Sequence, residues 1–430
     1  MTGHHHIAIV GGGLAGLATA AYLARAGKQV TLFERSEHLG GRGATLVHDG
    51  YYHNLGPHAL YRGGAAVEVL DDLGVVYTGN RPDVSGVAVR KGKTHTLPTA
   101  GRSMMTSRLF GMRARVEAGA QLLNLRKATG DGRTIEQYVN DDFKHDSARE
   151  YLQAIVRLTT YANAPATTSV ADAARQLAGG GQVLYLDRGW QTLVDGLEHA
   201  ATTAGATIRR GARVQGVAIA GRVRGLRLAD GSEFAADAVV LAVPPQVARE
   251  LALWSEPLAL AADTAIPAYA ACLDIGLARL PNPRRWFGLG IDVPCYFSIH
   301  TRSATLAPAG KTMLSVAKYI PAGKQGDAGR DLHELESFLD LVQPGWRALE
   351  EHRQYLPNML VQSALPRADR GGIAGRPDPL VPGAEGLFIA GDWVGQSGWL
   401  ADGTLGSARQ AAGSIERWLA AAREPVAVGS

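Results

Sequence analysis

A glycine-rich turn near the start of the chain constrains the fold more than any other feature. Residues 6–10 (HIAIV) are typical of a short buried strand, residues 11–16 spell G-x-G-x-x-G, and the alanine-rich residues 14–26 predict a helix. A second strand is predicted over residues 28–33, and Glu34 stands at its end, 18 residues past the last glycine of the turn. This order of strand, turn, helix, strand and acid is the βαβ pattern of dinucleotide binding.

Each position of the turn meets a physical requirement. Gly11 permits a tight turn, Gly13 lets a pyrophosphate approach the backbone, and Gly16 lets the helix pack closely on the strand. The first helical amides, those of Leu14 and Ala15, would face the phosphates. The alternative is a glycine-rich turn without a ligand, and the two strands and the acid at the expected spacing argue against it.

Glu34 indicates which nucleotide fits. Its carboxylate can accept hydrogen bonds from ribose hydroxyls and would repel a 2′-phosphate. NADP is therefore disfavoured, even though Arg35 is adjacent.

Composition excludes several classes of protein. The uncharged run over residues 7–24 has the length of a membrane span or export signal, but four glycines interrupt it and no basic region precedes it, so we expect neither. The net charge is +4 and no basic run with interleaved aromatics occurs, so no nucleic-acid partner is expected. Cys272 and Cys295 lack metal-ligand spacing, which predicts no metal site and favours a reducing, cytoplasmic location.

The 430 residues are enough for two or three domains. Further strands are predicted within residues 206–217, 234–245 and 386–390, and a helix runs from about residue 404 to 422. We predict an α/β fold with a Rossmann-type nucleotide domain and a second, α+β substrate domain formed from two insertions. The nucleotide domain comprises residues 1–75, 181–247 and 352–423, and the substrate domain comprises residues 76–180 and 248–351.

A second motif follows Glu34. Four residues after this acid the chain reads Leu39-Gly40-Gly41-Arg42, a pattern that resembles the flavin amine oxidase and phytoene desaturase superfamily. The resemblance implies FAD as the cofactor, with Gly40 and Gly41 passing under its diphosphate and Arg42 paired with phosphate. A guanidinium suits that task because its fixed fork of donors matches phosphate oxygens.

Other stretches resemble motifs of the same family in chain order. Residues 54–58 (NLGPH) look like the loop beside the flavin ring, although Asn54 stands where the family usually has an acid. Residues 388–392 (FIAGD) resemble the final motif, in which the acid binds a ribityl hydroxyl. The resemblance implies a non-covalent FAD that is also contacted by Gly56, Pro57, His58, Ala59, Val214, Gly391, Asp392, Gly398, Trp399 and Leu400.

The resemblance leaves several substrates open. Amine oxidases of the family carry a lysine near the flavin and an aromatic pair facing it, but residues 261–283 contain no lysine and Trp399 alone can be assigned to the pair. Trp399, His58 and Tyr61 are the catalytic candidates. We therefore expect desaturation of an apolar small molecule by hydride transfer to flavin N5, with oxygen, quinone or NAD as the electron acceptor.

Two alternative functions follow from the same resemblance. Amine oxidation is the first, and a non-redox escort protein that binds prenylated partners is the second. The intact glycines, together with Arg42 and Asp392, argue against a protein that has lost its cofactor.

Residues 101–127 form a basic segment. They contain five arginines and one lysine against Glu117 alone, interleaved with methionine, leucine and phenylalanine. Such a segment can lie at an anionic membrane surface and admit a lipophilic substrate. The alternative is that its apolar residues pack inward and its arginines are solvated.

Overall fold

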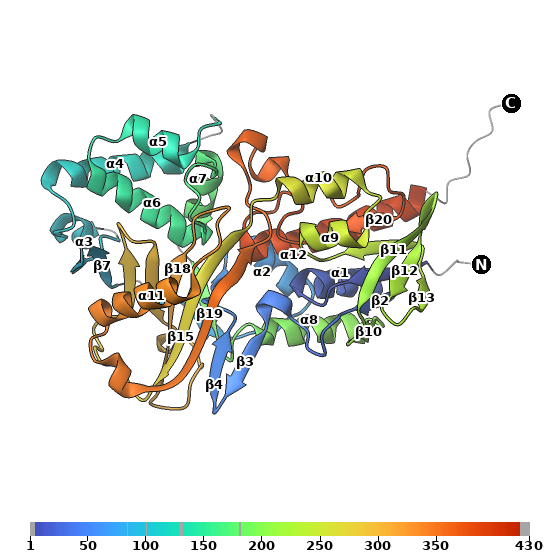
Figure 1. The fold of residues 1–430 in the computed structure, drawn as a ribbon, viewed down its shortest axis with the longest axis horizontal. Helices are drawn as coiled ribbons and strands as arrows, with labels where there is room; N and C mark the ends of the chain where they lie inside the picture. The colour runs from blue at the N-terminus through green and yellow to red at the C-terminus, as the bar shows by residue number, and fades with distance from the viewer. Residues whose placement is uncertain (1–4, 84, 100, 129–131, 180–181, 422–430) are drawn as a thin grey trace.

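The structure is a computed structural model that describes residues 5–83, 85–99, 101–128, 132–179 and 182–421. The predicted domain limits at residues 1, 180, 181 and 423 lie outside these ranges. The predicted α/β fold is confirmed, with one parallel sheet and a second, larger sheet (Figure 1). No helix within the described ranges is long and apolar enough to cross a bilayer.

The parallel sheet contains the strands predicted around the glycine turn. Its central strand pairs on both sides, because Ile7 lies opposite Val30 on one neighbour and Ala238 on the other. The strands are short, and all except the edge strand over residues 207–209 are nearly fully buried, as expected for a parallel sheet covered on both faces. In spatial order they are β10 (Thr207–Arg209), β2 (Gln29–Phe33), β1 (His6–Val10), β14 (Ala238–Leu241) and β20 (Leu387–Ile389).

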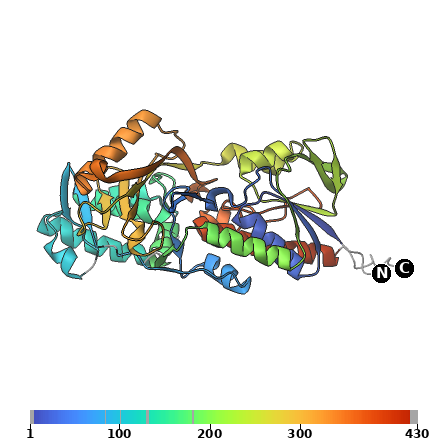
Figure 2. The same cartoon turned by 90° about the horizontal axis from the view of Figure 1, so that it is seen from below.

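Two layers cover this sheet on opposite sides (Figure 2). One layer consists of four helices, namely α1 (Leu14–Arg25), α2 (Ala65–Asp72), α8 (Gln191–Thr203) and α12 (Leu400–Ala421). The other layer consists of a small antiparallel sheet and two helices, namely β11 (Val214–Ala220), β12 (Arg222–Leu228), β13 (Glu233–Ala235), α9 (Pro245–Leu251) and α10 (Glu256–Thr264).

A seven-stranded sheet forms the second domain. Its order is β19 (Glu350–Gln362), β15 (Ala268–Leu277), β18 (Thr312–Tyr319), β17 (Cys295–Ile299), β16 (Phe287–Gly290), β7 (Val87–Arg90) and β8 (Lys93–Thr96). Side chains alternate between its faces, so Cys272 packs towards one helical layer and Leu273 towards the other. The first layer is α4 (Met112–Lys127), α5 (Ile135–Asp142), α6 (Asp146–Thr160) and α7 (Val170–Gly179), and the second is α11 (Ala328–Val342).

The remaining elements are short. They are β3 (Thr45–His48) paired with β4 (Tyr51–Asn54), a small sheet of β5 (Leu60–Tyr61), β9 (Val183–Leu186) and β6 (Gly79–Asn80), and helix α3 (Gly101–Thr106). The β3–β4 hairpin is the antiparallel pair that leads into the predicted flavin-side loop.

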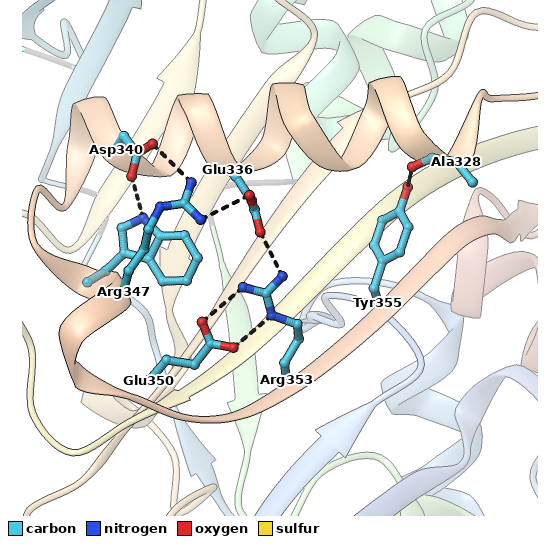
Figure 3. A network of polar contacts seen from close by, with 8 residues as sticks. Ala328, Glu336, Asp340, Arg347, Glu350, Arg353 and Tyr355 are labelled. Atoms are coloured by element: carbon cyan, nitrogen blue, oxygen red, sulfur yellow. Dashed lines mark hydrogen bonds and ion pairs between the residues drawn. The ribbon is translucent and has the colours of Figure 1, made fainter.

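A network of ion pairs fixes α11 to strand β19 (Figure 3). Arg353 contacts Glu350 through two nitrogens, at 2.7 and 2.9 Å, and donates to Glu336 on the helix at 2.6 Å. Arg347 bridges Glu336 and Asp340 at 3.0 and 3.1 Å. Several shared charges with bidentate geometry hold an element in place better than one exposed pair does. The network therefore fixes one end of β19.

Strand β19 links the two domains. It pairs with β15, for example at Leu273 and Tyr355, and so lies in the seven-stranded sheet, whereas residues 352–423 are predicted to belong to the nucleotide domain. Pairing partners cannot be seen in a single strand pattern, which explains this difference. The segment limits themselves stay a prediction.

Candidate active site

The turn between β1 and α1 requires glycine for steric reasons. Gly11 has a φ of +109°, and a Cβ there would lie 2.5 Å from the Ala242 carbonyl oxygen. A Cβ on Gly16 would overlap the Gly11 carbonyl oxygen. Gly13 differs, because the nearest atom to a Cβ there would be the Gly40 carbonyl oxygen at 3.8 Å, and Gly13 lines a cavity. Space is therefore left beside the start of α1, where helical N–H groups attract anions.

Glu34 braces the glycine turn. The Gly12 N–H donates to Glu34 Oε2 at 2.7 Å, and the Ser36 N–H donates to Oε1 at 2.9 Å. Each carboxylate oxygen has further acceptor capacity, and Glu34 lines the cavity together with Arg35. The carboxylate is therefore placed to accept hydrogen bonds from ribose hydroxyls.

A second turn brings Arg42 to the cavity. Gly40 and Gly41 have φ values of +111° and +53°, and the Gly40 N–H donates to the Gly12 carbonyl oxygen at 2.8 Å. Arg42 Nη1 then donates to Asp392 Oδ2 at 2.8 Å and to the Val361 carbonyl oxygen at 2.9 Å. A guanidinium has five N–H donors, so these two contacts orient Arg42 and leave donors directed elsewhere.

Asp392 is a buried carboxylate just after β20. Its Oδ2 also accepts the Ser363 N–H at 2.8 Å. Burial alone would raise the pKa of the Asp392 carboxyl, but the Arg42 guanidinium and the Ser363 donor hold that pKa below its usual value. Asp392 Oδ1 and Ser363 Oγ are buried and have no hydrogen-bond partner within the described residues. Buried polar atoms normally find partners, so this pair fits a ligand with hydroxyl groups, such as a ribityl chain.

His58 lies on the cavity wall as a neutral ring. Its Nδ1 is 2.7 Å from the Gly56 carbonyl oxygen, and its ring packs at 4.8 Å from that of Trp190. Burial lowers the pKa of the His58 imidazole below its usual value. Pro57 and Ala59 line the same wall. The loop therefore presents a fixed and uncharged surface.

Asn54 holds this loop in place. Its Oδ1 accepts the Thr45 hydroxyl at 2.7 Å and the Trp190 N–H at 3.1 Å, while Gln354 Nε2 donates to its carbonyl oxygen at 2.8 Å. Asn54 is buried and does not line the cavity. An acid at this position is therefore not needed for the loop to form.

These groups surround a cavity of about 560 Å³. Its volume lies in the range of small-molecule and cofactor sites. Strand β19 closes one side with residues 359–361, and Tyr161 closes another. The predicted cofactor residues that line it are Gly11, Gly13, Leu14, Ala15, Glu34, Arg35, Gly40, Gly41, Arg42, Pro57, His58, Ala59, Val214, Gly391, Asp392 and Leu400.

Comparison with known proteins identifies the family. The sequence profile described as "Flavin containing amine oxidoreductase" matches residues 14–271, more than half of the chain. The chain belongs to this family. The expected resemblance is confirmed, and FAD is the cofactor. The features of this structure that fit FAD are the glycine turns, Arg42, and the unpartnered oxygens Asp392 Oδ1 and Ser363 Oγ.

Relatives share either part of the sequence or the whole fold. Coproporphyrinogen III oxidase from Bacillus subtilis is 25% identical over 289 residues, which cover 57% of this chain and 61% of that protein. Carotenoid 3,4-desaturase from Haloarcula japonica is 49% identical over 51 residues, 12% of this chain and 10% of that protein. An oxidoreductase structure from Methanosarcina mazei aligns with a TM-score of 0.74 and 18% identity over 96% of this chain and 100% of that one. The chain thus matches less than two thirds of these curated relatives' lengths.

Five of the predicted site residues do not line the cavity of this flavoprotein. They are Gly16, Gly56, Tyr61, Gly398 and Trp399. Gly16 contributes indirectly, because its lack of a side chain lets helix α1 pack against the Gly11 turn. The Tyr61 hydroxyl donates to the Thr159 carbonyl oxygen at 2.9 Å, which is a structural contact.

Trp399 is placed differently from the expectation that it faces the flavin. It is 1% exposed and packs in an apolar cluster with Ala268, Leu365 and Ile373. The next residue, Leu400, has a φ of +53° and lines the cavity instead. The structure therefore supports core packing for Trp399 rather than a wall of the substrate site.

The cavity also includes residues that the sequence did not indicate. Residues 359–361 and Ser363 reach it at the end of a long strand without any local motif, and Tyr161 follows helix α6 with a φ of +53°. Positive φ is uncommon for tyrosine, so sequence offers no signal for it. The other unpredicted residues are Val10, Phe33, Gly43, Trp190, Ala212, Arg213, Ala242, Val243, Pro244, Val247, Glu250, Leu251, Ala390, Ala401 and Thr404.

Proposed function

We propose that the protein uses FAD to dehydrogenate a carbon centre of a flat, apolar small molecule, as desaturases do. The observation that carries the proposal is the absence of lysine among the described residues of the cavity wall. Strand β15 lies in the region where amine oxidases of the family are expected to carry their lysine, and it has none. Lys318 on the neighbouring strand is paired instead with Asp331 at 2.6 Å and Glu334 at 2.7 Å.

The substrate-domain side of the cavity supports an apolar substrate. Tyr161 lines the cavity, and behind it lie Tyr296 and Tyr319, whose rings stack at 5.8 Å. The Tyr161 and Tyr296 hydroxyls are 3.4 Å apart. Burial raises the pKa of all three phenols well above the usual value, so they stay neutral. Neutral aromatic walls suit flat apolar molecules.

Under this proposal the chain binds the cofactor and the substrate and orients them relative to each other. FAD, when bound, supplies the hydride acceptor at N5. Arg42 and Asp392 hold the cofactor, while Tyr161, Met359 and Leu400 position the donor carbon. The substrate loses a hydride and then a proton to water, so no charged side chain is required. His58 contributes a neutral, oriented surface because its pKa is lowered by burial.

Two of the relatives support this reaction class, whereas other matches are named as L-amino acid oxidases. One is named for oxidation of coproporphyrinogen III and another for desaturation of a carotenoid, and both names describe oxidation of a carbon skeleton. The match to the second covers only 51 residues, so it supports the reaction class less than the first does. Neither identity is high enough to name a substrate for this chain.

The test mixes the purified, FAD-loaded protein anaerobically with each member of a panel of apolar alkenes, a porphyrinogen and simple amines. Loss of flavin absorbance measures reduction of the flavin. We expect reduction by a member of the apolar group. Tyr161→Ala should slow that reduction about 100-fold while FAD stays bound, because misplacing a donor by about 1 Å has such an effect. Tyr161→Phe is the matched control and should stay near the parent rate, since the ring is retained.

Two outcomes would overturn the proposal. Rapid reduction by primary or secondary amines, with none by the apolar group, would make the protein an amine oxidase. A colourless protein that binds prenylated peptides and takes up no added FAD would identify an escort protein.

A further inference from the structure

Helix α4 carries an apolar stripe that faces solvent. Met112 is 71% exposed, Val116 67% and Leu123 59%, and Met105 on the preceding helix α3 is 73% exposed. Exposed apolar residues are normal when they are scattered singly. Four on two consecutive helices form a surface that the packing of this chain does not explain.

The stripe is set by helical spacing. At 3.6 residues per turn, Met112, Val116 and Leu123 lie within about 40° of one another around the helix axis. Ala114 and Leu125 lie on the opposite side and are buried in the core of the substrate domain. Helix α4 therefore has two apolar faces, and one of them has no partner in the described chain.

The corner between α3 and α4 is firmly held. Arg115 donates to the Met105 and Ser107 carbonyl oxygens, each at 2.6 Å, and the Ser107 hydroxyl donates to the Thr96 carbonyl oxygen at 2.6 Å. Gly119 faces the same side as the stripe, and the Met104 side chain lies against it. These contacts keep α3 alongside the stripe and fix the position of Met105.

The charge around the stripe is positive. Arg108 and Arg113 are exposed beside it. Glu117, the acid of the segment, is turned away and engaged, because its carboxylate accepts the Lys144 and His145 N–H groups and lies 2.9 Å from His145 Nδ1. Over residues 101–127 the sequence has six basic residues and one acid. The arginines would attract an anionic partner, and Glu117 would not repel it because its carboxylate is turned away.

We propose that the α3–α4 surface, made of Met105, Arg108, Met112, Arg113, Val116 and Leu123, docks on an anionic phospholipid bilayer. Helix α4 would lie in the plane of the interface with its stripe in the acyl boundary and its arginines at the headgroups. No described helix can span a bilayer, so the contact is interfacial. Figure 1 places α3 and α4 at the end of the molecule opposite the parallel sheet, so the nucleotide domain would point away from the membrane. This inference does not depend on the proposed substrate.

The experiment is flotation of the full-length, FAD-loaded protein with phosphatidylcholine vesicles that contain or lack phosphatidylglycerol. We expect binding to the anionic vesicles and little to the neutral ones. A variant with Met112→Ser, Val116→Ser and Leu123→Ser should lose at least tenfold in partitioning. Arg108→Gln with Arg113→Gln should lose about 25-fold, since each basic residue near an anionic surface contributes about fivefold.

The matched control replaces apolar residues of similar exposure elsewhere, Val76→Ser with Leu260→Ser, which are 82% and 58% exposed. It should bind like the parent protein. Circular dichroism and flavin content must match in all variants. Equal binding to both vesicle types, no binding, or binding unchanged by the stripe substitutions would overturn the proposal. A dimer in light scattering that the stripe substitutions convert to a monomer would also overturn it, by identifying a second copy as the occupant.

Discussion

Gly13→Ala should weaken FAD binding without weakening the fold. Gly13 has a φ of −82°, which alanine adopts without strain, and the nearest atom to the new methyl group would be the Gly40 carbonyl oxygen at 3.8 Å. Replacing glycine by alanine at a compatible position raises stability by about 0.4–1 kcal/mol. The FAD-free protein should therefore unfold at the same or a slightly higher temperature.

The same methyl group would enter the cavity where the FAD diphosphate is expected. Overpacking of a close contact costs typically about 1–3 kcal/mol. Since about 1.4 kcal/mol is tenfold, FAD affinity should fall roughly 5- to 150-fold. The assay removes the flavin, titrates FAD back with flavin fluorescence as the signal, and compares thermal unfolding of the FAD-free proteins.

Gly16→Ala is the matched control for this prediction. Its methyl group would overlap the Gly11 carbonyl oxygen, so it should impair folding itself. Unchanged FAD affinity in a folded Gly13→Ala protein would show that the diphosphate does not pass Gly13. Loss of folding in that variant would show that the turn is tighter than the contacts above indicate.

Four other outcomes are expected. Arg42→Ala should weaken FAD binding by about 1.5–3 kcal/mol in a titration, because a charge-assisted phosphate contact is lost, and Glu34→Ala should weaken it less. Trp399→Ala should destabilise the protein by about 3–5 kcal/mol in denaturant unfolding, as for a buried core aromatic, and leave the cavity wall intact. Burial raises the pKa of Asp274 to about 7, so the folded protein holds this proton more tightly and stability falls as pH rises from about 4 to 7. Asp274→Asn should remove that fall, roughly 3 kcal/mol between unfolding measured at pH 4.5 and pH 8, and parallel curves for both proteins would contradict this. Acid precipitation should release the flavin into the supernatant, whereas colour retained in the pellet would indicate a covalent bond.

Local motifs predicted the secondary structure on the nucleotide side of the cavity well. The strand His6–Val10, the glycine turn and helix α1 have nearly the expected limits, because close backbone approach permits only glycine at Gly11 and Gly16. The strand that leads to Asp392 could also be predicted, since a short apolar run ending in a turn is typical of a buried parallel strand.

The substrate half could not be predicted in the same way. Met359 reaches the cavity through long-range pairing of β19 with β15, and pairing partners leave no local signal. Tyr161 and Leu400 both adopt positive φ, which sequence would normally reserve for glycine or asparagine. At Leu400 the consequence is local, because Leu400 lines the cavity and the neighbouring Trp399 does not.

The parallel sheet combines strands from opposite ends of the chain, which has a consequence for synthesis. Strand β1 emerges from the ribosome first, but its sheet is completed by β20 and helix α1 is covered by α12, both near the end. At about 5–20 residues per second, roughly 20–80 s separate these events. During that interval the apolar side of α1 (Leu14–Arg25) needs temporary protection. Glu34 is made early, but FAD gains its contact with Asp392 only after residue 392 is made, so the cofactor stabilises the complete site more than any earlier state of the chain.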